Sequence, residues 1–144
     1  MSIRNKRLIK ENLDLNLNLE SDIITLNITQ YDLLITIKIN HFYPFQYPKM
    51  CIENVDYIQW LLNKKSKYNN LINLFNLNIP CICCDTITCM WTPVYGIKNL
   101  LKEFNDYYYS FYILEKFKII YTKINGFDDL IYTKIIKFLY LDNI

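Results

Sequence analysis

A chain of 144 residues, 52% hydrophobic and 21% charged, can bury an apolar core in one domain, and this composition excludes a disordered tail. A net charge of +2 is too small for the strong positive field of a general nucleic-acid binder, so no nucleic-acid partner is expected. Charged residues interrupt every long apolar run, and the first ten residues lack the apolar core of a signal peptide. We therefore expect one monomeric domain over residues 1–144, cytoplasmic or nuclear, with no membrane partner and with reduced cysteines.

The first third of the chain predicts one helix followed by strands. Ser2 is suited to cap a helix that runs to about Leu13. Alternating apolar and polar residues then predict three half-buried strands, joined by short polar links that suit hairpins. These runs cover residues 13–20, 24–29 and 34–39. Two prolines exclude regular structure from His41–Lys49, and a fourth strand is predicted over residues 50–55.

The second half predicts helices around an irregular segment. Tyr57 and Trp60 belong to the start of a possible helix, whereas the polar residues 64–70 predict an exposed insert without regular structure. Residues 79–93 are predicted to be irregular and contain four of the cysteines. Further helices are predicted over residues 97–109, 112–121 and 128–141, with a break at Asn125-Gly126. The order indicates the α+β class: an N-terminal helix, a four-stranded antiparallel meander, an active-site loop and C-terminal helices.

Three segments of the chain resemble motifs of the ubiquitin-conjugating (E2) enzyme family. Tyr43–Lys49, with the sequence Y-P-F-Q-Y-P-K, is similar to the Y-P-F-x-x-P-K loop that follows the family's third strand. Ile82–Asp85, followed by Trp91–Pro93, is similar to I-C-L-D and W-S-P at the family's spacing. Lys6–Glu11, with the sequence K-R-L-I-K-E, is similar to K-R-I-x-K-E of the family's first helix. The resemblance implies a UBC-like α+β fold over the first 110 or so residues, with a helical extension over 111–144.

The resemblance also implies a chemical role for several residues. Cys83 would accept ubiquitin, or a ubiquitin-like protein, as a thioester from an E1 and transfer it to a lysine, with or without an E3 ligase. Asp85 would orient the site, and Asn76 would supply the fixed donor that stabilises the oxyanion. The groove for E3 ligases would consist of Phe45, Pro93 and Val94. The contacts to the E1 would come from Lys6, Arg7 and Lys10. No cofactor is implied.

The chain departs from the family pattern before Cys83. It has no His-Pro-Asn segment, and strict spacing puts Phe75 at the position of the asparagine, one residue before Asn76. The stretch between Pro48 and Cys83 is also longer than is usual in the family. These departures keep a second hypothesis open, a catalytically inactive E2 variant or an RWD-like interaction module. A chain without alanine and rich in isoleucine and asparagine is typical of an A/T-rich genome, and a divergent member from a protist or a large DNA virus, then in the host cytoplasm, fits this composition.

The cysteines allow a third interpretation, a structural zinc site. Its four thiolates would come from Cys81, Cys83, Cys84 and Cys89. Zinc sites normally use two separated pairs of ligands, whereas these four cysteines lie within nine residues. Adjacent cysteines point apart in an extended chain, and the single histidine, His41, is remote in sequence. The sequence therefore favours no metal, with zinc as the alternative.

Overall fold

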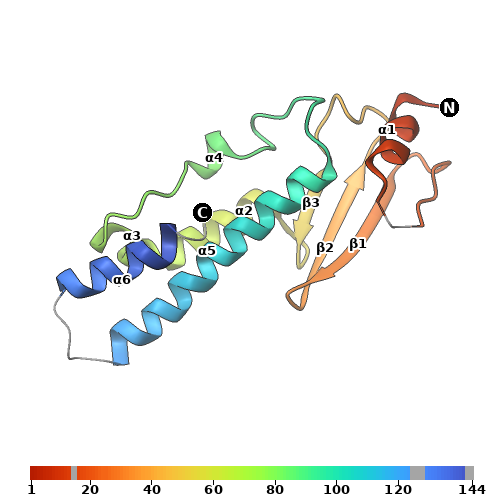
Figure 1. Ribbon diagram of the computed structural model, residues 1–144. Helices are drawn as coiled ribbons and strands as arrows, with labels where there is room; N and C mark the ends of the chain where they lie inside the picture. The colour runs from red at the N-terminus through yellow and green to blue at the C-terminus, as the bar shows by residue number, and fades with distance from the viewer. Residues whose placement is uncertain (14–15, 124–128, 142–144) are drawn as a thin grey trace.

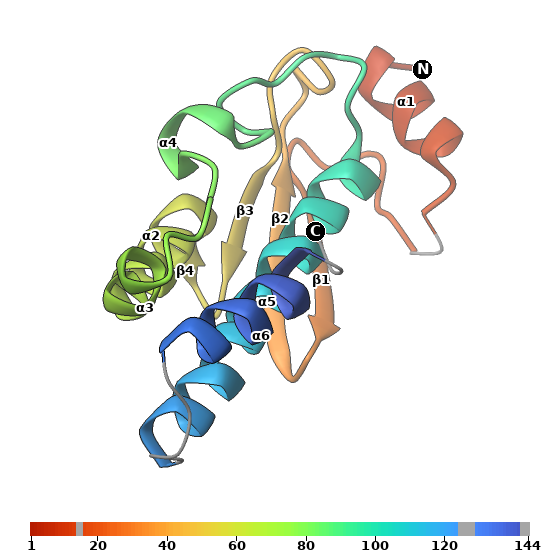
Figure 2. The same ribbon diagram turned by 60° about the vertical axis from the view of Figure 1, so that its left-hand side comes forward.

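A computed structural model describes residues 1–13, 16–123 and 129–141 (Figures 1 and 2). These residues form one four-stranded antiparallel sheet, with strands in the order β1-β2-β3-β4, and six helices. The elements are α1 (Ile3–Glu11), β1 (Ile24–Gln30), β2 (Leu33–Ile39), β3 (Lys49–Ile52), β4 (Val55–Asp56), α2 (Tyr57–Lys67), α3 (Asn69–Leu74), α4 (Ile82–Asp85), α5 (Ile97–Lys123) and α6 (Asp129–Leu141). The predicted α+β class with a four-stranded antiparallel sheet is confirmed.

The sheet has one buried and one exposed face because its side chains alternate along each strand. β1 and β2 form a hairpin in which Leu26 faces Ile37, and both side chains are buried. Its two-residue turn, Tyr31-Asp32, has both residues in the left-handed region, as the favoured hairpin turn requires. The strands predicted over 24–29 and 34–39 are confirmed. The run predicted over 50–55 turns at residues 53–54 and divides into β3 and the short β4.

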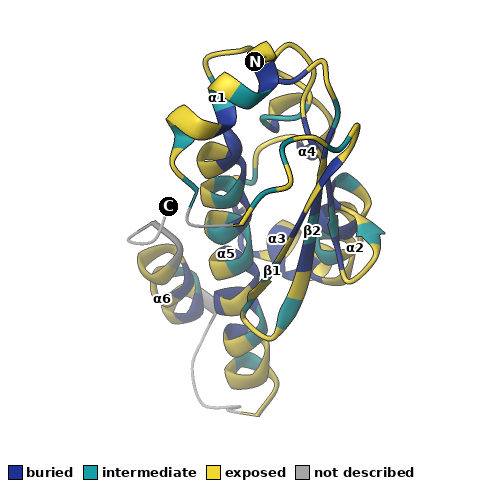
Figure 3. Ribbon diagram, turned by 90° about the vertical axis from the view of Figure 1, so that its right-hand side faces the viewer, coloured by how far each residue is buried: buried dark blue, intermediate teal, exposed yellow. Residues whose placement is uncertain are grey.

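Helix α5 covers the buried face of the sheet and extends well beyond it (Figures 1 and 2). Phe104 is fully buried and lies against the rings of Tyr57 and Trp60 from the start of α2. Beyond the sheet, Phe117 of α5 packs against Phe75 after α3, and α6 packs on the same end of the molecule. Figure 3 shows the buried residues along α5 and the inner side of the strands. Of the described helices, none combines the length and the apolar character needed to cross a bilayer.

The strand predicted over residues 13–20 was wrong. Residues 16–20 are irregular, and residues 14–15 lie outside the described residues. The carbonyl oxygen of Leu19 is bound by α1 and not by a neighbouring strand: it accepts from the Arg4 guanidinium at 3.2 Å. The carbonyl oxygens of Ser21 and Asp22, directly after this segment, accept from the same group at 2.8 and 2.7 Å. Leu13, Leu17 and Leu19 still pack partly against the core. The alternation of apolar and polar residues therefore reflects partial burial and not the pairing of strands.

The irregular insert predicted over residues 64–70 is helical instead, although most of these residues are exposed as expected. α2 continues to Lys67 and α3 begins at Asn69, with the buried ring of Tyr68 between them. The Tyr68 ring stacks on Phe111 of α5, so one aromatic side chain anchors an otherwise polar stretch. The helices predicted over 97–109 and 112–121 are one continuous helix, α5. The helix predicted over 128–141 is found as α6, and Asn125-Gly126 lies outside the described residues.

Candidate functional site

The Glu11 carboxylate joins the first helix to two distant segments. Its oxygens accept hydrogen bonds from Arg7 Nε at 2.8 Å, from the Ile97 backbone N–H at 3.0 Å and from the Tyr43 hydroxyl. A Cβ atom at Gly96 would lie 3.0 Å from this carboxylate, so any larger residue there would require the Glu11 side chain to shift. Burial, followed by the bond to Glu11, raises the pKa of Tyr43, which therefore stays a neutral donor.

A second contact joins the proline loop, residues 41–48, to the segment Trp91–Pro93. Trp91 Nε1 donates to the carbonyl oxygen of Pro44 at 2.8 Å, and the Trp91 and Tyr43 rings lie 6.1 Å apart. Arg7 adds bonds to the carbonyl oxygens of Val94 and Tyr95 at 3.3 and 3.1 Å. Helix α1, the proline loop and Trp91–Pro93, which all carry parts of the E2-like motifs, thus meet at one junction, although they are far apart in the sequence.

Three of the cysteines, Cys81, Cys83 and Cys84, lie on one tight turn, the cysteine turn, residues 81–86. Cys81 and Asp85 are bonded to each other twice: Cys81 N–H donates to Asp85 Oδ2 at 2.9 Å, and Asp85 N–H donates to the Cys81 oxygen at 2.8 Å. Ile82 points inward and is buried, whereas Cys83 is exposed. The predicted site residues Cys83 and Asp85 are therefore neighbours on the same turn.

The Sγ atoms of Cys81, Cys83 and Cys84 form a compact group, the cysteine cluster. Cys83 Sγ lies 3.0 Å from Cys81 Sγ and 3.4 Å from Cys84 Sγ. The expectation that Cys83 and Cys84 point apart was wrong, because the turn is helical and not extended. Hydrogen bonds from Cys83 and Cys84 lower the pKa of Cys81, and the bonds to Cys83 and Cys81 raise the pKa of Cys84 to about 12. The contacts within the cluster thus move the pKa values of Cys81 and Cys84 in opposite directions.

Glu103 of α5 holds the chain that follows the cysteine turn. Its carboxylate accepts from the Ile87 backbone N–H at 2.8 Å and from the Tyr57 hydroxyl at 3.0 Å. Burial of Glu103 is the main cause that raises its pKa, and burial also raises the pKa of Tyr57. The buried Thr86 hydroxyl donates to the Ile82 oxygen at 3.0 Å and closes the turn from within.

The predicted oxyanion donor, Asn76, lies directly after α3. Its backbone is left-handed, with φ of 50°, and its N–H donates to the Asn73 oxygen at 3.3 Å. This is the position where asparagine commonly ends a helix. Within the described residues, the Asn76 side chain makes no hydrogen bond, and its predicted role stays a prediction. Phe75, which strict spacing puts in that position, is buried against Phe117.

The predicted E3 groove and E1 contacts are at the junction end of the molecule. Phe45 is 64% exposed, Val94 is 83% exposed, and Pro93 is exposed beside it. The Trp91–Pro44 bond holds the two loops that carry these apolar residues side by side. On α1, Lys6 and Lys10 are exposed, whereas the Arg7 guanidinium is bonded within the chain.

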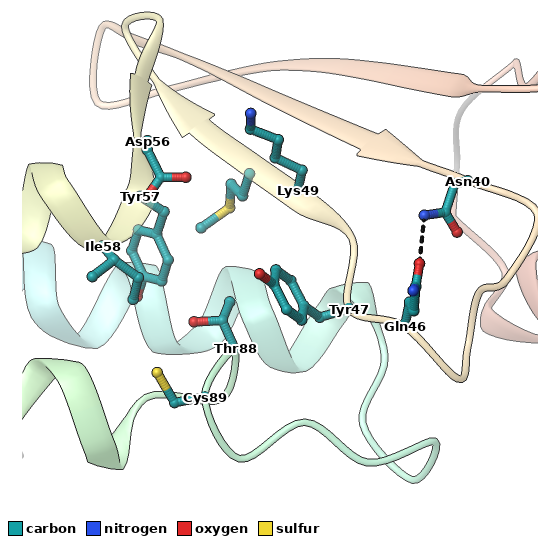
Figure 4. Close-up of a pocket in the computed structure, with 10 residues that line it drawn as sticks. Asn40, Gln46, Tyr47, Lys49, Asp56, Tyr57, Ile58, Thr88 and Cys89 are labelled. Atoms are coloured by element: carbon teal, nitrogen blue, oxygen red, sulfur yellow. Dashed lines mark hydrogen bonds between the residues drawn. The ribbon is translucent and has the colours of Figure 1, made fainter.

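A pocket of about 540 Å³ lies between the proline loop, β3, the start of α2 and the chain after the cysteine turn (Figure 4). Tyr57 lines it from the start of α2, Tyr47 lines it from the proline loop, and Thr88 and Cys89 line it from the chain after the cysteine turn. Cys83 does not line this pocket. The predicted nucleophile is therefore exposed and lies outside this pocket.

Sequence reasoning missed the roles of Glu11, Gly96 and Glu103. Glu11 belonged to a recognised motif but had no assigned function. One feature of the sequence pointed to Glu103: it is an acidic residue directly before Phe104, which belongs to the apolar face of a predicted helix. The packing of Gly96 against Glu11 could not be predicted from the sequence, because it depends on a contact between distant segments.

No protein-family model, no curated protein and no solved structure matches this chain.

Proposed function

We propose that this chain is a UBC-like, E2-type ubiquitin-conjugating domain in which Cys83 carries ubiquitin, or a ubiquitin-like protein, as a thioester. The observation that carries the proposal is the junction. Glu11 of the first helix bonds Tyr43 of the proline loop, and Trp91 bonds Pro44. Segments that resemble one family by chance have no reason to contact each other in this way. The exposed Cys83 thiol precedes Trp91 at the family's spacing.

The proposed reaction moves one acyl group twice without any redox change. Cys83 Sγ attacks the thioester carbon of the charged E1, the bond to the E1 sulfur breaks, and the proton lost by Cys83 goes to the E1 thiolate. A lysine amine then attacks the Cys83 thioester, an isopeptide bond forms, and the Cys83 thiolate leaves and takes up the proton lost by the amine. Splitting the transfer into two steps is the advantage of a covalent intermediate.

The shape around Cys83 supports a macromolecular substrate. A thiol on an exposed turn outside the pocket can meet the extended C-terminus of a modifier protein, whereas a small substrate would need a concave site. The exposed Phe45, Pro93 and Val94 provide a small apolar surface at the junction end of the molecule. A surface of this kind suits a transient protein partner such as an E3 ligase.

One observation favours the second hypothesis, an inactive E2 variant or RWD-like interaction module. Asn76 serves as the left-handed residue after α3, and in the described part of the chain its side chain has no hydrogen bond. Without a fixed donor the oxyanion of aminolysis loses its stabilisation, which is commonly worth a factor of about 10²–10³ in rate. Such a domain would bind the modifier or its ligases without transferring anything.

A charging assay separates the two functions. The reduced protein is incubated with ATP and with matched pairs of E1 and modifier, starting with ubiquitin, and analysed by electrophoresis with and without a reductant. We expect one reductant-sensitive adduct. It should disappear with Cys83→Ala and persist with Cys84→Ala and Cys89→Ala, which remove other exposed thiols.

Each outcome of the charging assay has a defined meaning. An adduct that follows Cys81 or Cys84 instead of Cys83 overturns the assigned nucleophile. No adduct with any pair, from protein whose Cys83 reacts with iodoacetamide, rejects the enzyme in favour of the module. Charging followed by very slow discharge to free lysine would show that thioester formation survives without the oxyanion donor.

A further inference from the structure

Three cysteine side chains gather on the solvent side of α4. Their Sγ atoms lie within 4.8 Å of one another, and all three residues are exposed. Within the described residues, Cys89 and Cys51 do not join this group: Cys89 lines the pocket of Figure 4, and Cys51 lies in β3. We propose that the cysteine cluster, Cys81, Cys83 and Cys84, binds one thiophilic metal ion, zinc(II) or copper(I), through its three sulfur atoms.

The distances between the sulfur atoms suit a shared metal ion. A zinc–thiolate bond is about 2.3 Å long, so two thiolates on one tetrahedral ion lie about 3.8 Å apart. Cys83 Sγ lies 3.0 Å from Cys81 Sγ and 3.4 Å from Cys84 Sγ. The sulfur atoms therefore need to separate by less than about 1 Å, which side-chain rotation can supply.

The backbone that carries the three ligands is fixed before any ion binds. The paired bonds between Cys81 and Asp85 close the turn on its exposed side, and the buried Ile82 anchors it from below. A ligand set on a short, anchored turn loses little conformational entropy on binding. This distinguishes the cysteine cluster from cysteines scattered over a mobile loop.

The ligand atoms select the class of metal. Thiolates prefer soft ions such as zinc(II) and copper(I) over magnesium or calcium, which take oxygen ligands. Within the described residues no fourth cysteine, histidine or carboxylate belongs to the group. Three sulfur ligands complete a trigonal copper(I) site, or leave the fourth tetrahedral position of zinc(II) open to water.

The metal site stands on the sulfur geometry alone. Its consequence for charging rests on the proposed function: if Cys83 accepts the modifier, a bound ion occupies the same sulfur and prevents transfer. The experiment therefore measures metal binding directly, so that a failure of charging leaves the metal site intact and the reverse also holds.

The test titrates the reduced full chain, without oxygen, with zinc(II) against a chromogenic chelator, and separately with copper(I) against bicinchoninate. We expect one ion per chain for at least one metal. Cys81→Ser and Cys84→Ser should each weaken binding by at least about tenfold, because each removes a direct ligand. Cys89→Ser, which removes an exposed thiol outside the cluster, should bind as the unchanged chain does. Circular dichroism checks that each variant is folded.

A second readout needs no substitution. Iodoacetamide labelling followed by mass spectrometry should find Cys81, Cys83 and Cys84 protected in the presence of the metal, with Cys89 still labelled. The proposal is overturned if neither metal binds in a one-to-one ratio, if Cys89→Ser weakens binding as much as Cys81→Ser, or if metal protects Cys89 alone. The two titrations also decide which ion is preferred.

Discussion

At the scale of single residues, Glu11 joins the first helix to two distant segments of the chain with one side chain. Its side chain is 9% exposed and accepts from the Arg7 side chain, the Tyr43 hydroxyl and the Ile97 backbone. The same bond to Glu11 raises the pKa of Arg7, which remains charged. An acid at this position therefore satisfies three donors from three parts of the chain with one side chain.

Replacing Glu11 with alanine should destabilise the fold. Glu11→Ala leaves the Tyr43 hydroxyl and the Ile97 N–H without an acceptor, and the expected loss in the free energy of unfolding is about 2–3 kcal/mol. Urea denaturation followed by circular dichroism measures this loss. Glu20→Ala, at an exposed acid, should change stability by less than about 0.5 kcal/mol. Equal effects of the two substitutions would show that Glu11 does not hold the junction.

Residue roles were the least predictable part of the site. The motif around Cys83 and Asp85 predicted that the two residues belong to one site. In the structure both residues lie on the same turn. The assignment of Asn76 depended on matching a spacing in a chain rich in asparagine. A side chain such as Glu103, whose partners lie in α2 and after the cysteine turn, cannot be recognised until the helices that surround it are in place.

At the scale of elements, α5 connects the core to the site. Phe104 faces the core and is fully buried, and the adjacent Glu103 turns toward the chain after the cysteine turn. One helix thus fixes the distance between the sheet and that chain. Because burial raises the pKa of Glu103 above its ordinary value of 4.5, the folded chain keeps this proton to a higher pH than the unfolded chain does.

The raised pKa predicts how stability depends on pH. Between pH 4.5 and the raised pKa the unfolded chain binds fewer protons than the folded one, so the contribution of Glu103 to stability falls as pH rises through this window. Glu103→Gln removes the titration, and its amide oxygen can still accept from Ile87. From pH 4.5 to 7, the variant should therefore gain stability relative to the unchanged chain.

Urea denaturation at several pH values measures this gain. Any fixed cost of the amide is the same at every pH, so the slope of the difference is the readout. Glu20→Gln, which removes the same charge at an exposed position, corrects for the change in net charge. Parallel pH profiles for Glu103→Gln and the unchanged chain would contradict the prediction.

The elements themselves were predictable where packing and local pattern agree. The alternation over β1 and β2 gave the hairpin because both strands bury every second residue. The same alternation over residues 13–20 led to a wrong prediction of a strand. Alternating burial also arises in an irregular segment, and here Arg4 of a helix binds carbonyl oxygens at the end of that segment. For residues 64–70 the sequence failed to predict helix. The stretch is polar on average, and that average does not reveal the single buried tyrosine, Tyr68, that anchors it.

At the scale of the whole molecule, α1, the proline loop and the segment Trp91–Pro93 meet at one end, and the α5–α6 pair forms the other (Figure 1). The apolar residues exposed at the first end include those of the proposed E3 groove. This placement separates a surface for partners from the helical end of the molecule. Whether residues 111–144 act as an extension to a UBC-like domain stays a prediction.

The E3 groove predicts a separation between charging and discharge. Phe45→Ala should leave thioester formation on Cys83 unchanged, and it should slow E3-stimulated discharge by about fivefold or more, as loss of an interface anchor does. Single-turnover discharge with an E3 ligase measures the effect. Phe42→Ala, on the same loop and 54% exposed, is the matched control and should discharge normally. Equal slowing by both variants would exclude Phe45 as the anchor.

The position of the two tryptophans gives the molecule two built-in optical reporters. Trp60 lies 8% exposed in the core against Phe104 and Phe111, whereas Trp91 sits at the junction with its indole bonded to Pro44. With Trp60 replaced by phenylalanine, the remaining emission would report only on the docking of the two loops. Loosening of the junction would then be visible as a spectral change that precedes the loss of helical signal on unfolding.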